Sequence, residues 1–250
     1  MRPLPALVEY LDRFLDTAAV ADYSGAHNGL QVENSGQVTK LGAAVDACEA
    51  VITEAASRGV SLLLVHHGLF WSPQRLTGAM YRKTKAALSA DLAVYSSHLP
   101  LDLHPVVGNN ALLAKALGLG KTKPAFPFKG RPIGLKTTAS LSLEELSRRL
   151  EKVLGSAPHL AAGGPAKTRR IGIVTGGAGS EVAQAAAERV DTFITGEGPH
   201  HSYTLAEELG INLFYGGHYA TETFGVKALA AHLSKKFRLP WEFIDHPTGL

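Results

Sequence analysis

Histidine and carboxylate residues in two parts of this sequence have the spacing of metal ligands. They are His66, His67, Asp102, His218 and Glu222. His218 and Glu222 are four positions apart at the start of an expected helix, so their side chains share one helix face and can reach a common ion. Imidazoles and carboxylates together suit zinc, iron, manganese or cobalt better than copper(I) or calcium. These residue types therefore predict a site for divalent metal ions.

The histidine doublet His66-His67 indicates two ions rather than one. A turn at Gly68 can splay the adjacent imidazoles toward two neighbouring ions. A doublet taken alone is better explained by one core and one surface histidine, but here further histidine–carboxylate pairs follow other expected strands, which favours ligands. Five protein ligands are few for two ions. A bridging carboxylate, which we assign to Glu222, and a bridging hydroxide would complete the shells, with the ions roughly 3.5–4 Å apart.

The elements that must position these residues alternate between strands and helices. A first helix is expected at residues 4–15, where apolar residues recur about every 3.6 positions. One alternating set is expected at residues 41–45 (strand), 49–57 (helix), 60–65 (strand), 81–90 (helix) and 92–96 (strand). A second set is expected at residues 171–175 (strand), 180–189 (helix), 192–195 (strand), 202–209 (helix) and 212–215 (strand). Between and after them we expect a strand at 133–138, a helix at 142–154 capped by Ser142, a long helix at 220–237 and a strand at 241–244.

Both sets follow a βαβαβ pattern, which predicts parallel strands and right-handed crossovers. The fold class is thus α/β, with two similar lobes from a duplicated βαβαβ unit. We expect the first lobe at residues 1–125, with His66, His67 and Asp102. The second is expected at residues 126–250, with His218 and Glu222, its last strands and long helix closing the cleft. Ligands of parallel sheets bind beyond the carboxyl ends of the strands, so the site is expected between the lobes.

Bulk properties fit a globular protein. The chain has 250 residues, of which 45% are hydrophobic and 19% charged, and a formal net charge of +3. A dedicated nucleic-acid binder would be more basic. The single cysteine, Cys48, excludes an internal disulfide, and we expect neither a signal peptide nor a membrane-spanning stretch. We therefore expect a cytoplasmic protein that has no contact with a membrane.

Further polar residues at expected strand ends are candidates for catalysis. Glu197 is interpreted as a general acid or base, with a carboxylate favoured by a helix start as the alternative. His98 is interpreted as a group that faces the substrate or supports a ligand, with a purely turn-fixing role as the alternative. Asp46 is interpreted as a group that orients a ligand histidine. The glycine-rich segment 176–180 indicates a tight strand-to-helix turn rather than a phosphate site.

The remaining histidines have no partner at ligand spacing and are interpreted as surface or structural residues. They are His27, His104, His159, His232 and His246.

Several of these segments, in this order, resemble one known family. They are NGLQV at 28–32, HHGLFW at 66–71, SHLPLD at 97–102, TGE at 195–197 and GHYATE at 217–222. The chain resembles the GTP cyclohydrolase 1 type 2 homologues, also called NGG-interacting-factor-like proteins. The resemblance implies two α/β lobes, a ring-shaped homo-hexamer and two divalent ions per subunit. It also implies that His66 and His218 bind one ion and that His67 and Asp102 bind the other, with Glu222 shared.

The resulting hypothesis is a metal-dependent hydrolase of the cyclohydrolase type, in which a metal-bridging hydroxide attacks a small-molecule substrate. The family name indicates a nucleotide, GTP, as that substrate. The alternative is a hexameric metal-binding scaffold that engages nucleic acid or a protein partner without catalysis. A third hypothesis is metal storage or delivery, which predicts loosely held ions.

Overall fold

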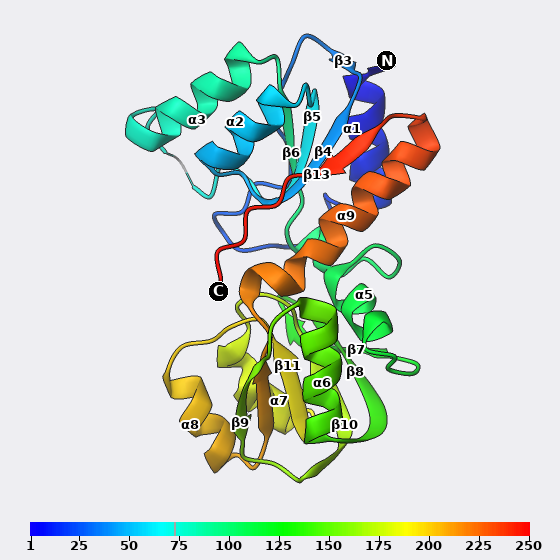
Figure 1. The fold of residues 1–250 in the computed structure, drawn as a ribbon, viewed down its shortest axis with the longest axis vertical. Coiled ribbons are helices and arrows are strands. Elements are labelled where there is room, and N and C mark those ends of the chain that lie inside the picture. Colours follow the sequence, from blue (N-terminus) through cyan, green and yellow to red (C-terminus); the bar gives the residue numbers. More distant parts are fainter. Residues whose placement is uncertain (73) are drawn as a thin grey trace. The chain divides into compact units, whose positions relative to one another are not determined.

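The computed structural model describes residues 1–72 and 74–250, and it divides into two compact units. Unit 1 comprises Met1–Leu101 and Gly225–His246, and unit 2 comprises Asp102–Phe224 and Pro247–Leu250. Figure 1 shows the strands and helices of each unit. Among residues 1–72 and 74–250, no helix is long and apolar enough to cross a membrane.

Unit 1 contains a five-stranded sheet with the strand order β13-β4-β5-β6-β2. Its strands are β2 (Gly29–Val32), β4 (Leu41–Asp46), β5 (Leu62–His67), β6 (Ala93–Ser96) and β13 (Trp241–Phe243). Strands β13, β4, β5 and β6 are parallel, whereas β2 runs antiparallel to β6. A small antiparallel pair stands apart from this sheet and consists of β1 (Arg2–Pro3) and β3 (Gln37–Val38).

Helices cover both faces of this sheet. They are α1 (Leu4–Phe14), α2 (Glu49–Ser57), α3 (Gly78–Ser89) and the C-terminal part of α9 (His218–Phe237). The short helix α4 (Leu99–Asp102) follows β6 and ends at the first residue of unit 2. Helices α2 and α3 lie on one face, and α1 and the end of α9 lie on the other (Figure 1). Leu63 and Val65 of β5 pack with Ile52 of α2 in one apolar cluster. Because both faces are covered, β5 is apolar throughout until it reaches its histidines.

Unit 2 contains a six-stranded sheet with the strand order β7-β8-β10-β11-β12-β9. Its strands are β7 (Lys123–Phe128), β8 (Arg131–Ser142), β9 (His159–Ala162), β10 (Lys167–Ile173), β11 (Thr192–Thr195) and β12 (Asn212–Tyr215). Strands β10, β11 and β12 are parallel, and β8 and β9 flank them in antiparallel orientation. In both units, three strands that follow one another in the chain are parallel neighbours, β4-β5-β6 in unit 1 and β10-β11-β12 in unit 2. An antiparallel strand, β2 or β9, lies beside the third of them.

The helices of unit 2 pack on this sheet. They are α5 (Asn109–Ala116), α6 (Leu143–Leu154), a 3-10 turn (Gly179–Glu181), α7 (Val182–Ala187), α8 (His201–Glu208) and the first turns of α9. Leu113 of α5 and Leu146 of α6 share an apolar cluster with Ile171 of β10. The side chain of Ser142 accepts a hydrogen bond from the Glu145 N–H, which confirms the predicted cap of α6.

The predicted α/β architecture with two sheets is confirmed, and so is the parallel pairing within each βαβαβ set. The division into units differs from the expected boundary after residue 125. Residues 102–125 belong to unit 2, because α5 packs on α6 and β7 pairs with β8. Residues 225–246 belong to unit 1, because β13 pairs with β4.

Candidate metal centre

The histidine doublet lies at the carboxyl end of β5, where an apolar strand meets polar surroundings. His66 is fully buried, and His67 is partly exposed. The Nδ1 atom of His66 lies 2.9 Å from the carbonyl oxygen of Ser97, just after β6. A carbonyl oxygen only accepts hydrogen bonds, so Nδ1 of His66 carries the proton and Nε2 is the nitrogen suited to coordination.

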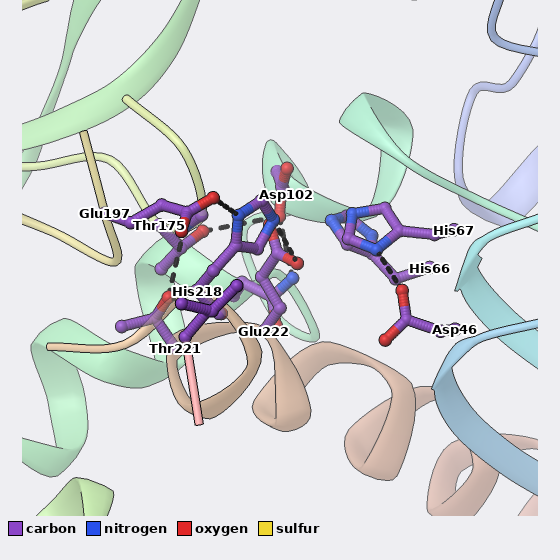
Figure 2. A network of polar contacts seen from close by, with 12 residues as sticks. Asp46, His66, His67, Asp102, Thr175, Glu197, His218, Thr221 and Glu222 are labelled. Atoms are coloured by element: carbon purple, nitrogen blue, oxygen red, sulfur yellow. Dashed lines mark hydrogen bonds and ion pairs between the residues drawn. The ribbon is translucent and has the colours of Figure 1, made fainter. Parts of the chain in front are cut away.

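Asp46, at the end of the neighbouring strand β4, orients the second histidine of the doublet. Its Oδ1 atom lies 2.8 Å from Nδ1 of His67, as Figure 2 shows. The two residues are direct partners in the parallel register of β4 and β5. A carboxylate that holds one ring nitrogen fixes the orientation of the imidazole and raises the basicity of the other nitrogen. The prediction that Asp46 orients a candidate ligand is therefore confirmed.

His98 lies beside the doublet in unit 1. His66, His67 and His98 each offer a ring nitrogen within 4.8 Å of the others. The Nδ1 atom of His98 lies 2.9 Å from Oδ1 of Asp22, a residue that the sequence analysis did not single out. Burial alone would raise the pKa of Asp22, but the hydrogen bond and charge of His98, with hydrogen bonds from Asn28 and the Tyr23 N–H, lower it to about 2.

The turn after the doublet needs a glycine. A Cβ atom on Gly68 would lie 2.4 Å from the side-chain amide of Gln31 in β2. The Oε1 atom of Gln31 accepts hydrogen bonds from the backbone N–H groups of Leu69 and Phe70, at 2.7 and 3.3 Å. The Gln31 side chain thus holds the chain where it leaves β5, and this contact fixes the position of the doublet.

In unit 2, the N-terminal turn of α9 brings one histidine and one glutamate together. Helix α9 begins at His218, two residues earlier than predicted. The Nε2 atom of His218 lies 3.1 Å from Oε2 of Glu222, and its Nδ1 atom lies 2.8 Å from Oε1 of Glu197 (Figure 2). The predicted shared helix face of His218 and Glu222 is therefore confirmed.

The two carboxylates favour a positive charge on His218. Burial alone would lower its pKa, but the hydrogen bonds and charges of Glu222 and Glu197 raise the pKa of His218 from 6.5 to about 9. A divalent cation supplies positive charge of the same kind when it replaces this proton.

Asp102 adds a second buried carboxylate in unit 2. Asp102 and Glu222 are 6% and 2% exposed, and each offers an oxygen within 4.8 Å of the other. The side chain of Asn109 donates a 2.7 Å hydrogen bond to Oδ1 of Asp102. Two buried carboxylates this close repel each other unless protons or cations compensate them. The donor set of unit 2 therefore suits a cation.

The glycine-rich segment after β10 serves this cluster and is a turn, as expected. Gly176 has a φ of +72°, and a Cβ atom there would lie 2.1 Å from Oε1 of Glu222. Its carbonyl oxygen accepts hydrogen bonds from the N–H groups of Gly196 and Glu197. Its N–H donates to Oγ1 of Thr221 at 3.1 Å. The segment therefore fixes the backbone that carries Glu197.

All seven predicted site residues thus lie in polar clusters of their own unit. Unit 1 brings together His66, His67 and His98. Unit 2 brings together Asp102, Glu197, His218 and Glu222. Asp22, Asn109 and Thr221 are not predicted from the sequence, and each holds a site residue or the turn beside it. Asn109 follows an expected strand by more than ten residues, so only the packing of α5 brings it to Asp102.

The protein has an α/β fold with two mixed sheets. Its buried histidine, aspartate and glutamate groups can bind metal ions. It is therefore of the class of α/β proteins that have a candidate metal site. The family model for Duf34/NIF3 (NGG1p interacting factor 3) matches residues 4–248. Proteins named GTP cyclohydrolase 1 type 2 homolog from Deinococcus radiodurans and Pseudomonas aeruginosa are each 40% identical to this chain. The alignments cover 98% of this chain and 93% and 97% of those relatives. The chain therefore belongs to the Duf34/NIF3 family.

Solved structures show the same fold. TTHA1606 from Thermus thermophilus superposes with a TM-score of 0.89 at 40% identity, over 100% of both chains. A protein described as ybgI, of unknown function, superposes with a TM-score of 0.92 at 34% identity, also over 100% of both chains.

Proposed function

We propose that this protein is a metal-dependent hydrolase of the GTP cyclohydrolase type, with two divalent ions per subunit. The proposed ligands are His66, His67, Asp102, His218 and Glu222. The name shared by the relatives supports the reaction class and indicates a nucleotide substrate. The ions are proposed to be zinc, iron or manganese, because the donors are imidazole nitrogens and carboxylate oxygens.

One observation carries the proposal: each proposed ligand histidine has Nδ1 held by an oxygen atom. Ser97, Asp46 and Glu197 provide these oxygens for His66, His67 and His218 respectively. Metal-binding histidines almost always have this second contact, which selects the tautomer that coordinates through Nε2. Three such contacts within one set of residues are difficult to explain by packing alone.

When bound, such ions act as Lewis acids and lower the pKa of a coordinated water. The residues of the chain orient the ligands and move protons. Glu197 is proposed to hold His218 in place and to exchange a proton with the substrate at its carboxylate. His98, fixed by Asp22, is proposed to donate or accept a proton at Nε2. General acids and bases of this kind act when they lie within hydrogen-bond reach of the reacting group.

Metal analysis of ligand variants tests the binding part of the proposal. We expect about two ions per subunit in the wild-type protein and fewer in His67→Ala and Glu222→Ala, measured by plasma mass spectrometry after dialysis. His201→Ala removes an exposed histidine outside the proposed site and serves as the matched control. If both ligand variants kept the wild-type metal content, the ligand assignment would be wrong.

Turnover measurements test the catalytic part. The metal-loaded protein is incubated with GTP, other nucleotides and simple phosphoesters, and ring opening or phosphate release is followed by chromatography. We expect metal-dependent turnover of at least one nucleotide, lost in His67→Ala and retained in His201→Ala. Full metal content without turnover of any compound would favour a non-catalytic protein.

A metal-binding scaffold is the alternative, because the family description names an interacting factor. In that case the protein would retain DNA or a protein partner in native gels, and DNA retention would weaken as salt rises. We also propose a homo-hexamer from the family resemblance. Analytical ultracentrifugation tests this assembly, and a monomer at micromolar concentration would contradict it.

A further inference from the structure

A cavity beside Glu197 is not used by the proposed metal ligands. It lies within unit 2 and has a volume of about 530 Å³. This volume is in the range of pockets that bind small organic ligands. Four of the residues that line it carry aromatic rings, namely His159, His200, Tyr203 and Tyr215.

His159, Tyr203 and Tyr215 form a cluster of neighbouring rings in this lining. The ring of His159 lies 5.5 Å from that of Tyr203 and 6.0 Å from that of Tyr215, measured between centroids. His159 and Tyr215 are direct partners in the pairing of β9 with β12. The hydroxyl of Tyr215 lies 2.7 Å from Oγ of Ser202. The strand pairing fixes the backbone of His159 and Tyr215, and the hydrogen bond orients the Tyr215 ring, so less conformational entropy is lost when a ligand stacks there.

The backbone at Gly198 lies close to Ser202 and Tyr215. A Cβ atom on Gly198 would lie 2.7 Å from Oγ of Ser202 and 3.1 Å from Cε1 of Tyr215. A side chain at this position would therefore push against the hydrogen bond that orients Tyr215. The nearest atom, the Cα of Gly179, would lie 2.6 Å away, so glycine also allows these two backbone segments to approach each other.

Glu197 connects the cavity with the proposed metal ligands of unit 2. Its side chain lines the cavity, and its Oε1 atom lies 2.8 Å from Nδ1 of His218. A carboxylate only accepts hydrogen bonds when ionised, so it selects ligands with N–H or O–H donors. Aromatic rings and a carboxylate in the lining of one cavity favour a flat, nitrogen-containing ring.

We propose that this cavity binds a planar nitrogen heterocycle, which stacks on Tyr203, Tyr215 and His159 and donates a ring N–H to Glu197. The assignment of that ring as the part of the substrate that reacts rests on the proposed function, whereas its binding does not. His159, which the sequence analysis interpreted as a surface or structural residue, becomes part of the binding site.

Guanosine is a suitable probe because it carries a planar ring with N–H donors and no phosphate. Its dissociation constant is measured by isothermal titration calorimetry on the full chain, with ribose as the non-planar comparison. We expect saturable binding of guanosine and none of ribose. Stacking on an aromatic side chain contributes a factor of about ten or more in affinity, so Tyr203→Leu is expected to weaken guanosine at least about tenfold.

Matched variants keep the test specific. Tyr203→Phe keeps the ring and is expected to bind like the wild-type protein, and so is Tyr81→Leu, which removes a half-exposed tyrosine from α3 in unit 1. Glu197→Gln is expected to weaken guanosine, because the acceptor carboxylate is lost. Thermal unfolding confirms that each variant is folded. Equal affinity of Tyr203→Leu and the wild-type protein, or no binding of guanosine, would overturn the proposal.

The outcome is separable from that of the proposed function. His67→Ala lies in unit 1 and is expected to lose turnover while it keeps guanosine affinity within about twofold. Guanosine binding without turnover by the wild-type protein would reject the hydrolase and support the cavity. Turnover with unchanged kinetics in Tyr203→Leu would support the hydrolase and reject the cavity.

Discussion

The two units use the same order of parallel strands but end them with different donor atoms. In unit 1, β5 ends in two histidines, and His98 follows β6. In unit 2, Glu197 follows β11, and β12 leads into the helix that carries His218 and Glu222. Nitrogen donors thus predominate at one set of strand ends and oxygen donors at the other. A duplicated scaffold therefore does not imply duplicated chemistry.

What the units share is the way in which a histidine is held. In unit 1, Asp46 at the end of β4 holds His67 on the next strand of the sheet. In unit 2, Glu197 after β11 holds His218 after the next strand, β12. In both cases the carboxylate comes from the strand that precedes the histidine. Parallel strands place their carboxyl ends side by side, so both units can orient a histidine with a carboxylate from the neighbouring strand.

The largest effect is expected at the turn that faces Glu222. Gly176→Ala forces a Cβ atom to within 2.1 Å of Oε1 of Glu222, at a φ of +72°. The positive φ costs about 1–2 kcal/mol for alanine, and the overlap adds about 1–3 kcal/mol. We expect the free energy of unfolding, measured in urea, to fall by about 2–5 kcal/mol, with a loss of bound metal.

Gly210→Ala separates the cost of the positive φ from the cost of the overlap with Glu222. Gly210 has a φ of +69°, but the nearest atom to its Cβ position, the Gly163 carbonyl oxygen, is 4.0 Å away. This variant should lose only about 1–2 kcal/mol and keep its metal. Equal destabilisation by the two variants would show that the Glu222 contact is not important.

Variants of Asp46 and Glu197 test whether the two units hold their histidines in the same way. Asp46→Asn and Glu197→Gln keep the shape of each side chain but remove its charge. Loss of such a partner reduces metal affinity about 10–100-fold. Competition with a chelator measures this change, and Glu54→Gln, on an exposed helix surface, is the control. Unchanged affinity in both variants would contradict the shared holding role.

The same pair of variants separates the roles of the two units. If Glu197 also exchanges protons, Glu197→Gln will lose more turnover at saturating metal than Asp46→Asn does. Equal turnover at saturating metal would limit Glu197 to positioning His218.

The sequence predicts the repeated parts of the fold well, because each repeat buries apolar runs of typical length. The expected helix at 49–57 and the strands at 192–195 and 212–215 have the observed bounds. The sequence predicts the edge strand β13, at 241–244, but not the edge strands β2, β7 and β9. Strand β7 contains Pro124 and Pro127. Prolines in a sequence usually indicate a loop, but they are tolerated in a strand at the edge of a sheet.

The candidate site was predictable where local spacing or strand ends define it. The pair His218 and Glu222 lies on one helix turn, and Asp46 ends a strand beside His67. Asp22 was not predictable in this way, because it lies in a loop and meets His98 across 76 positions of sequence. The sequence has no periodic signal for such a contact, which depends on how the loop before β2 folds.

Asp22 is expected to stabilise unit 1 in a pH-dependent manner. Its folded pKa, about 2, lies below the ordinary aspartate value of 3.8, and its side chain is 5% exposed. A depressed pKa contributes stability above pH 3.8 that is lost as the pH falls toward 2. We expect Asp22→Asn to lower the free energy of unfolding at pH 5 by about 2 kcal/mol.

The difference from the wild-type protein should shrink between pH 4 and pH 2, as urea unfolding at several pH values would show. Glu9→Gln alters a carboxylate whose side chain is 71% exposed, and it should change stability by less than about 0.5 kcal/mol. A constant difference across this pH range would mean that Asp22 acts through packing and not through its charge.

The smallest effect concerns how helices begin in the two units. Ser142 caps α6 of unit 2 by accepting a 3.1 Å hydrogen bond from the Glu145 N–H, whereas Thr77 precedes α3 of unit 1 and makes no side-chain cap bond within the described part of the chain. Ser142→Ala should therefore cost about 1 kcal/mol in urea unfolding, and Thr77→Ala only a few tenths. Equal costs would indicate that the intrinsic preference of the cap residue matters more than its hydrogen bond. The difference between the two variants thus measures how much one local contact adds to α6 beyond its packing on the sheet.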